Sequence, residues 1–115
     1  MKLDLDVLRS CLIEVETVIQ APGDQFTIGD DDDFLRFYHF RQLFHAGRLE
    51  AKPSPRSNAR MFTIFDLTPS GHELLKKMRN DTVWAKAKGK VSELGGQVPL
   101  RVMEKILDGA WDQLL

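Results

Sequence analysis

The sequence predicts an α+β fold that is mostly helical, in a single domain of 115 residues. A helical stretch in the middle of the chain ends at Ala46-Gly47, and glycine commonly takes the left-handed position just after a helix. Two expected strands, 49–52 and 60–67, then flank a loop rich in proline and serine. Thr68-Pro69 begins a new helix, because threonine caps helices and proline suits the first helical position. A helix, a strand pair joined by such a loop, and a further helix form the order of a winged-helix unit, with the loop as its wing.

Two elements are expected before the central helix of this unit, a first helix over about 4–20 and a short edge strand over 25–28. Apolar residues in the helix recur at spacings of three and four, as on a helix packed on one side. They are Leu8, Cys11, Leu12, Val15, Val18 and Ile19. Asp4 or Asp6 is expected to cap this helix, and Phe26 and Ile28 to share one face of the strand.

The central helix, expected over about 31–46, has two different faces. Steps of about 100° per residue place four apolar residues on one arc, the predicted core face: Phe37, Phe40, Leu43 and Phe44. The opposite arc combines aromatic, basic, amide and imidazole side chains: Phe34, Tyr38, Arg41, Gln42 and His45. This mixture suits an interface that reads another molecule. It also suits a helix clamped on both sides, with Phe34 and Tyr38 buried against later helices.

Residues 81–115 are expected to extend a winged-helix core of residues 1–80. Asp81-Thr82 predicts a fresh cap or a kink, Gly95-Gly96 the end of a helix, and Pro99 the start of the last one. The chain should therefore finish in two helices.

These two helices carry long apolar stripes and one tryptophan each, Trp84 and Trp111. So much apolar surface predicts a homodimer through the C-terminal helices. The alternative is an intramolecular hairpin in which 82–94 packs against 99–114.

Composition indicates an ordinary cytoplasmic protein, with 43% hydrophobic and 29% charged residues. No apolar run approaches the roughly 20 residues needed to cross a bilayer, so no membrane association is expected. The start of the chain, residues 1–6, is too acidic and too short in apolar length for a signal peptide. The single cysteine, Cys11, is expected to be a small core residue in a reducing compartment.

Charge is distributed unevenly, although the formal net charge is only −1. Residues 1–35 hold two basic and nine acidic residues, a charge of −7, and residues 36–115 hold fourteen basic and eight acidic ones, a charge of +6. Within the second part, residues 36–60 carry six basic residues against Glu50 alone, a local charge of +5. Such a basic block can track phosphates. It is also compatible with a solvated face or with charge pairing inside the protein.

No motif for catalysis, a cofactor or a metal ion stands in the sequence, so we expect neither an enzyme nor a cofactor. His72-Glu73 begins like a zinc-protease helix, but Lys76 stands where the second histidine is needed. His39 and His45 lie about 240° apart around one helix and cannot share a metal. The run 30–33 is four aspartates without the alternate spacing of calcium loops. Carboxylates at a helix N-terminus are stabilised by its free amides and dipole, which explains the run without an ion.

Several motifs follow one another along the chain: Met1-Lys2-Leu3-Asp4-Leu5-Asp6, Tyr38-His39, Ala46-Gly47, Leu67-Thr68-Pro69-Ser70-Gly71-His72-Glu73, Asp81-Thr82-Val83-Trp84 and Gly95-Gly96. In these motifs, which cover nearly the whole chain, the protein resembles a family of short uncharacterised bacterial and phage-borne proteins, a domain of unknown function. That family implies no particular activity.

A looser resemblance, over 39–47 and 67–71, is to winged-helix repressors of the ArsR, MarR and PadR kinds. It implies that the central helix enters a DNA major groove and that the wing touches the backbone. The chain departs from those repressors in three ways. Only nine residues separate Gln20 from Asp30, which leaves no room for a helix just before the central one. Four aspartates occupy the helix entrance, and Arg48 stands where an apolar residue is usual.

Two functions are therefore predicted. The first is a DNA-binding transcriptional regulator of phage or prophage origin, in which Tyr38, Arg41 and Gln42 reach base edges. On the wing, Lys52, Arg56 and Arg60 would hold phosphates. Arg48 is a further candidate DNA-binding residue. The second is a protein-interaction module, an adaptor or inhibitor of a host complex, on the same scaffold. Its interface would use aromatic residues, which are enriched in binding hot spots: Phe34, Tyr38, Trp84 and Trp111.

Overall fold

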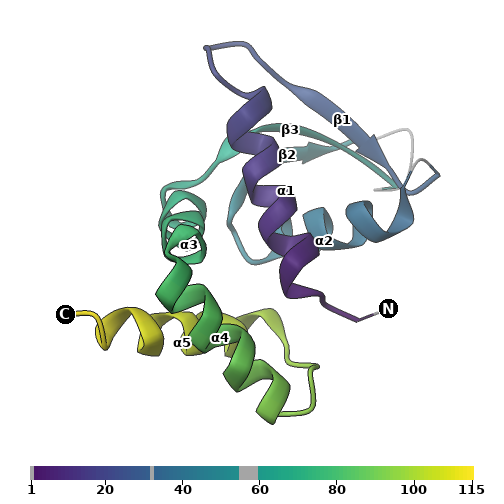
Figure 1. Cartoon of the computed structure of the whole chain (residues 1–115). Helices are drawn as coiled ribbons and strands as arrows, with labels where there is room; N and C mark the ends of the chain where they lie inside the picture. The colour runs from purple at the N-terminus through teal and green to yellow at the C-terminus, as the bar shows by residue number, and fades with distance from the viewer. Residues whose placement is uncertain (1, 32, 55–59) are drawn as a thin grey trace.

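The computed structural model describes residues 2–31, 33–54 and 60–115. In that part of the chain, a helix, a strand, a helix, a β-hairpin and three helices follow one another, as Figure 1 shows. This order confirms the predicted fold class, a mostly helical α+β domain that ends in a helical hairpin. The elements are α1 (Leu5–Val18), β1 (Phe26–Gly29), α2 (Phe34–His45), β2 (Leu49–Pro53), β3 (Met61–Leu67), α3 (Pro69–Arg79), α4 (Asp81–Glu93) and α5 (Leu100–Asp112).

The three strands form one antiparallel sheet in the order β1-β3-β2. The β2–β3 pair confirms the predicted strand pair of the wing, with Leu49 opposite Leu67, and the register shifts between Glu50 and Ala51. Strand β1 adds at one edge, with Phe26 opposite Ile64, as expected for an edge strand.

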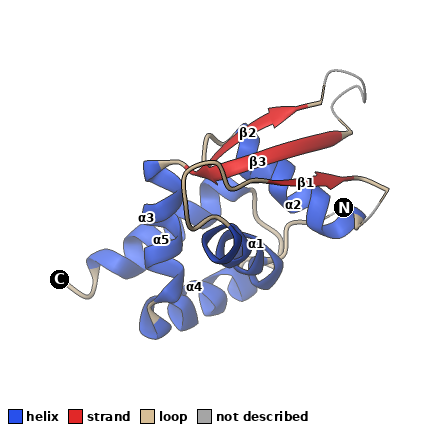
Figure 2. Ribbon diagram, turned by 90° about the horizontal axis from the view of Figure 1, so that it is seen from above, coloured by secondary structure: helices blue, strands red, loops and turns tan. Residues whose placement is uncertain are grey.

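Helices α1 and α2 cover one face of this sheet, as Figure 2 shows from above. Aromatic rings join the layers: Phe37 of α2 stacks on Phe62 of β3 with 5.3 Å between ring centroids. Residues alternate between the two faces of a strand, so every second side chain points away from these helices. The exposed residues on that opposite face include Thr27, Lys52, Met61 and Phe65.

Helices α1 and α2 are both shorter than their predicted ranges, and the caps explain where each helix starts. The carboxylate of Asp4 accepts a hydrogen bond from the Val7 amide, so Asp4 rather than Asp6 caps α1, which ends at Val18. Asp33 likewise accepts from the Arg36 amide, so α2 starts at Phe34 and not at residue 31. An N-cap residue has extended backbone angles, which keeps the residues before it out of the helix.

Glycine ends α2 as predicted. Gly47 has a φ of 75°, and the amides of Gly47 and Arg48 donate to the carbonyls of Phe44 and Leu43. These two bonds form a Schellman motif, which satisfies the last carbonyls of the helix. The chain is thereby turned directly into β2.

The C-terminal helices form the predicted intramolecular hairpin, with α4 packed against α5 in the lower part of Figure 1. The predicted cap at Asp81-Thr82 is wrong by one residue. Asn80 closes α3 and caps α4, because its side-chain oxygen accepts from the amides of Thr82 and Val83. Gly95 and Gly96 end α4 with positive φ angles, as expected.

One hydrophobic cluster takes buried residues from every helix and strand, from Leu5 of α1 to Ala110 of α5. Cys11 belongs to it and is 2% exposed, which confirms its predicted place in the core. Among the described residues, no helix is both long and apolar enough to cross a membrane.

Candidate functional site

The outer face of α2, predicted to contact a partner, is bordered by two other segments. Tyr38 and Gln42 are half-buried and line a hollow of about 350 Å³ together with Lys2, Leu3 and the loop 97–100. The guanidinium of Arg41 lies 5.7 Å from the ring centre of Phe37 and 5.9 Å from that of Tyr38. This face is therefore accessible, but the N-terminal segment and the loop 97–100 border it.

The arginines of the basic block are largely paired with carboxylates. Arg48 holds Glu104 of α5 through two hydrogen bonds, and Arg36 holds Glu14 of α1 in the same way. Hydrogen bonding to Glu104 raises the pKa of the Arg48 guanidinium above its ordinary value. Three of the six basic residues in segment 36–60 are thus paired with carboxylates elsewhere in the same chain.

Arg60, immediately before β3, pairs with the acidic run before α2. Its Nε lies 2.9 Å from Asp30 Oδ2 and its Nη2 lies 3.3 Å from Asp31 Oδ1. The hydrogen bond to Asp30 raises the pKa of Arg60. Two carboxylates therefore stand beside Arg60, a residue predicted to hold a phosphate, and carboxylates repel phosphates.

The other two residues predicted to contact phosphates are Lys52 and Arg56. Lys52 is exposed on the open face of the sheet and makes no ion pair with any residue that the structure describes. Arg56 lies outside the described residues.

The four residues predicted for a protein interface have different environments. Phe34 is 50% exposed and Tyr38 is half-buried. Trp84 is only 8% exposed, with the Arg9 guanidinium 4.8 Å from its ring centre, and Trp111 is half-buried with Lys76 above it. Much of the surface of both tryptophans is thus buried within the chain itself. The homodimer through the C-terminal helices stays a prediction.

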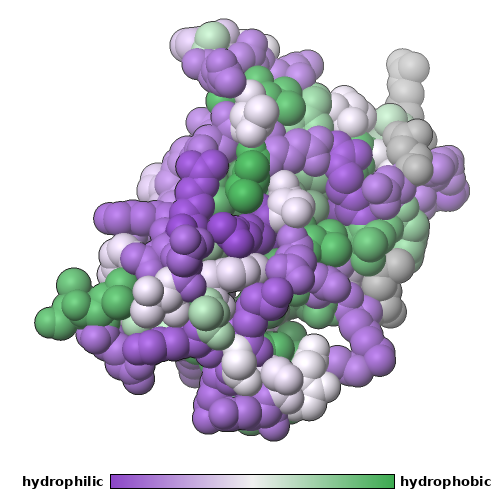
Figure 3. Space-filling view, in the orientation of Figure 1, coloured by the Kyte–Doolittle hydropathy of each residue, from purple (hydrophilic) through white to green (hydrophobic). Residues whose placement is uncertain are grey.

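Leu35, which the sequence pattern missed, extends the exposed surface of Phe34. It is 44% exposed and lies in the first turn of the same helix. Figure 3 shows hydrophobic atoms over α2 on this side of the molecule. Two large apolar side chains next to each other in an exposed first turn differ from the scattered apolar residues of an ordinary surface.

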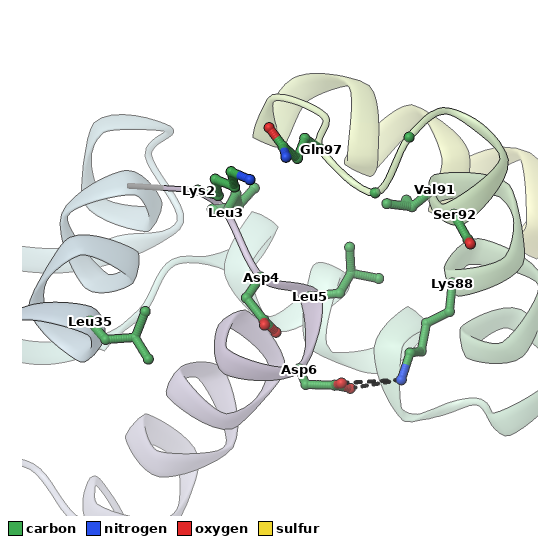
Figure 4. Close-up of a pocket in the computed structure, with 12 residues that line it drawn as sticks. Lys2, Leu3, Asp4, Leu5, Asp6, Leu35, Lys88, Val91, Ser92 and Gln97 are labelled. Carbon is green, nitrogen blue, oxygen red and sulfur yellow. Dashed lines mark hydrogen bonds and ion pairs between the residues drawn. The ribbon is translucent and has the colours of Figure 1, made fainter.

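Leu35 also borders a groove of about 550 Å³ between the N-terminal segment, α2, and the end of α4 (Figure 4). Leu5 and Val91 are buried at its base and point toward each other in the figure. Lys88 and Asp6 close one side with an ion pair, in which Nζ lies 3.1 Å from both carboxylate oxygens. The groove thus has an apolar interior with charged groups at its edge.

His39 holds one wall of this groove in place. The ring is fully buried, and Nε2 accepts a hydrogen bond of 2.8 Å from the Asp4 amide. Nδ1 must then carry the proton, which it donates to the Leu35 carbonyl, also at 2.8 Å. The sequence carried a signal for this residue, because His39 stands four positions before Leu43 on the buried stripe of α2.

Metal-binding side chains are dispersed over the part of the chain that the structure describes. No group of three or more His, Cys, Asp or Glu side chains there could hold a metal ion. Burial raises the pKa of the Cys11 thiol to about 12, so this residue is a poor nucleophile.

The fold and the surface define a small α+β protein with a winged-helix-like order of elements, an apolar groove and paired surface charges. The chain belongs to the DUF2513 family of hypothetical proteins, whose model matches residues 2–97. It is also 34% identical to an uncharacterized protein of Haemophilus influenzae, over 100% of this chain and 99% of that protein. No solved structure matches the chain. The predicted membership of a family of unknown function is confirmed, and the likeness to winged-helix repressors stays a prediction.

Proposed function

We propose that this protein is a protein-interaction module that binds a partner protein through Phe34, Leu35 and the adjoining groove. Phe34 and Leu35 are the main support, because two large apolar side chains are about half exposed in the first turn of α2, beside a groove with an apolar interior. Interfaces commonly have an aromatic anchor and a desolvated apolar centre surrounded by polar groups. Here the polar groups would be Lys2, Lys88 and Asp6 at the edge of the groove.

Electrostatics favours this function over DNA binding. Arg36, Arg48 and Arg60 are engaged with carboxylates of the same chain, and the partners of Arg60 are Asp30 and Asp31. DNA binding draws much of its free energy from cations that replace counterions along the phosphates. Among the predicted DNA contacts that the structure describes, Arg41 and Lys52 are the cations without an ion pair.

The test compares partner capture by the wild-type chain and three variants. Phe34→Asp and Leu35→Asp place a charge in the apolar patch, and acidic residues are well tolerated in the first turn of a helix. Leu114→Asp is the matched control, because Leu114 is 43% exposed at the other end of the chain. In lysate of the organism that encodes the protein, we expect a partner that wild type and Leu114→Asp retain and that both α2 variants lose.

A DNA titration separates the two predicted functions. Fluorescence polarisation with labelled genomic duplexes at low salt should show no binding at micromolar protein. Saturable binding that Arg41→Ala and Lys52→Ala weaken, together with unchanged capture by the α2 variants, would establish DNA binding in place of this proposal.

A further inference from the structure

A second groove, of about 560 Å³, runs between α4 and α5 and shares no residue with the groove beside Leu35. Its walls come from positions three or four apart on each helix, so it follows the two helices along their length. The floor is formed by Ile106 and the buried Ala110. The two helices that form it, α4 and α5, lie at the end of the molecule away from the sheet (Figure 1).

Two glycines widen this groove without any need inside the fold. Gly89 lies in α4 and Gly109 in α5, and neither has a positive φ. A Cβ atom added at either position would meet nothing within 4 Å. Glycine inside a helix is less stable than alanine, so this chain keeps two unfavourable residues where alanine would fit. Residues that break a local rule without a structural reason are expected at functional sites.

Lysines surround the same space. Lys86, Lys90 and Lys105 line the groove against Glu93 alone, which gives its walls a charge of +2. Lys86 donates to Gln113 across the groove at 3.2 Å, and Lys90 pairs loosely with Glu93 at 3.6 Å. Lys105 makes no ion pair or hydrogen bond with any residue in the described part of the chain. Cations are therefore available to a ligand along both walls.

We propose that the α4–α5 groove docks an acidic amphipathic helix of a partner protein. The glycines let a third backbone approach closely, the apolar floor receives the apolar stripe of that helix, and the lysines pair with its carboxylates. A groove with an apolar floor between two helices fits a third helix better than a duplex, whose phosphates would contact only the rims. This inference goes beyond the proposed function, because it assigns a separate surface and a partner chemistry.

The experiment selects binders from a displayed library of helix-forming peptides against the intact chain. Enriched peptides should be acidic with an apolar stripe on one face. The tightest of them should bind at least tenfold more weakly to Gly109→Leu, which fills the groove, and to Lys105→Glu. Circular dichroism of each variant verifies that it is folded, and Gly89→Leu repeats the steric test from the other helix.

Two variants serve as matched controls. Arg101→Glu makes the same charge change on an exposed residue of α5 that does not line the groove, and it should leave peptide binding unchanged. Phe34→Asp should also leave it unchanged, so failure of this site is distinguishable from failure of the α2 site. Enrichment without acidic bias, equal binding by the groove variants, or duplex DNA that binds with the same sensitivity to Lys105→Glu would overturn the inference.

Discussion

The guanidinium of Arg48 holds the carboxylate of Glu104, with Nε 2.8 Å from Oε1 and Nη2 2.6 Å from Oε2. The two residues lie 56 positions apart, and their side chains are 27% and 18% exposed. This pair joins the entrance of the β-hairpin to α5. A residue predicted to contact DNA thus links the β-hairpin to the C-terminal helices.

We expect Arg48 and Glu104 to be energetically coupled. A double-mutant cycle with Arg48→Met and Glu104→Gln, followed by urea unfolding, should give a coupling of about 1–2 kcal/mol, because the bond is bidentate and partly buried. The Arg60–Asp31 pair is the control. It should show much weaker coupling, since those side chains are 62% and 89% exposed. Equal coupling in the two cycles would contradict this account.

The same substitution should have opposite effects at two glycines. A Cβ at Gly71 would lie 2.1 Å from the carbonyl oxygen of Arg48, so Gly71→Ala should lower the free energy of unfolding by about 3 kcal/mol. Gly109→Ala should raise it by about 0.5–1 kcal/mol, because the added methyl meets nothing and helix propensity improves. Thermal and urea unfolding measure both, and a loss of stability in Gly109→Ala would show that this glycine has a structural role.

His39 should matter far more to stability than His45. His39→Ala removes a buried ring and leaves the Asp4 amide without its acceptor, which should cost about 2–4 kcal/mol. His45→Ala, at an exposed position, should change stability by less than about 0.5 kcal/mol. Hydrogen exchange of the Asp4 amide, slow in wild type, should become fast in His39→Ala. Unchanged exchange would mean that the histidine does not anchor the N-terminal segment.

Cys11 should resist thiol reagents until the protein unfolds. Burial raises its pKa to about 12 from an ordinary 9.0, so the thiolate fraction near pH 8 falls about a thousandfold. Labelling by a disulfide reagent should be slow in the native protein and complete in denaturant. Rapid stoichiometric labelling of the native protein would be incompatible with its place in the core.

The same shift predicts a loss of stability at alkaline pH. The unfolded chain loses the thiol proton near pH 9, and the folded chain keeps it until about 12. The stabilisation is therefore fully present below pH 9 and is lost as the pH rises from 9 to about 12. Unfolding free energies of wild type and Cys11→Ala across this range should differ in slope, and parallel curves would rule the effect out.

Much of the fold could be predicted from local patterns. The Ala46-Gly47 end of α2, the Thr68-Pro69 start of α3 and the apolar stripe of α1 each depend on residues close together in the chain. Capping and helical periodicity act over one or two turns, so a sequence displays them directly. The cap at Asn80 was misplaced by one residue because asparagine, aspartate and threonine all suit that position.

The order of elements, the core face of α2 and the uneven distribution of charge all follow from the amino-acid sequence. The packing of the folded chain settles what the charges do, because the partners of Arg36, Arg48 and Arg60 lie 22, 56 and 29–30 residues away. It also decided that Trp84 is buried, that Phe34 and Leu35 stay exposed, and that Gly89 and Gly109 open onto one groove. Such contacts depend on how whole helices pack. The spacing of residues in the sequence does not indicate which distant side chains will be in contact.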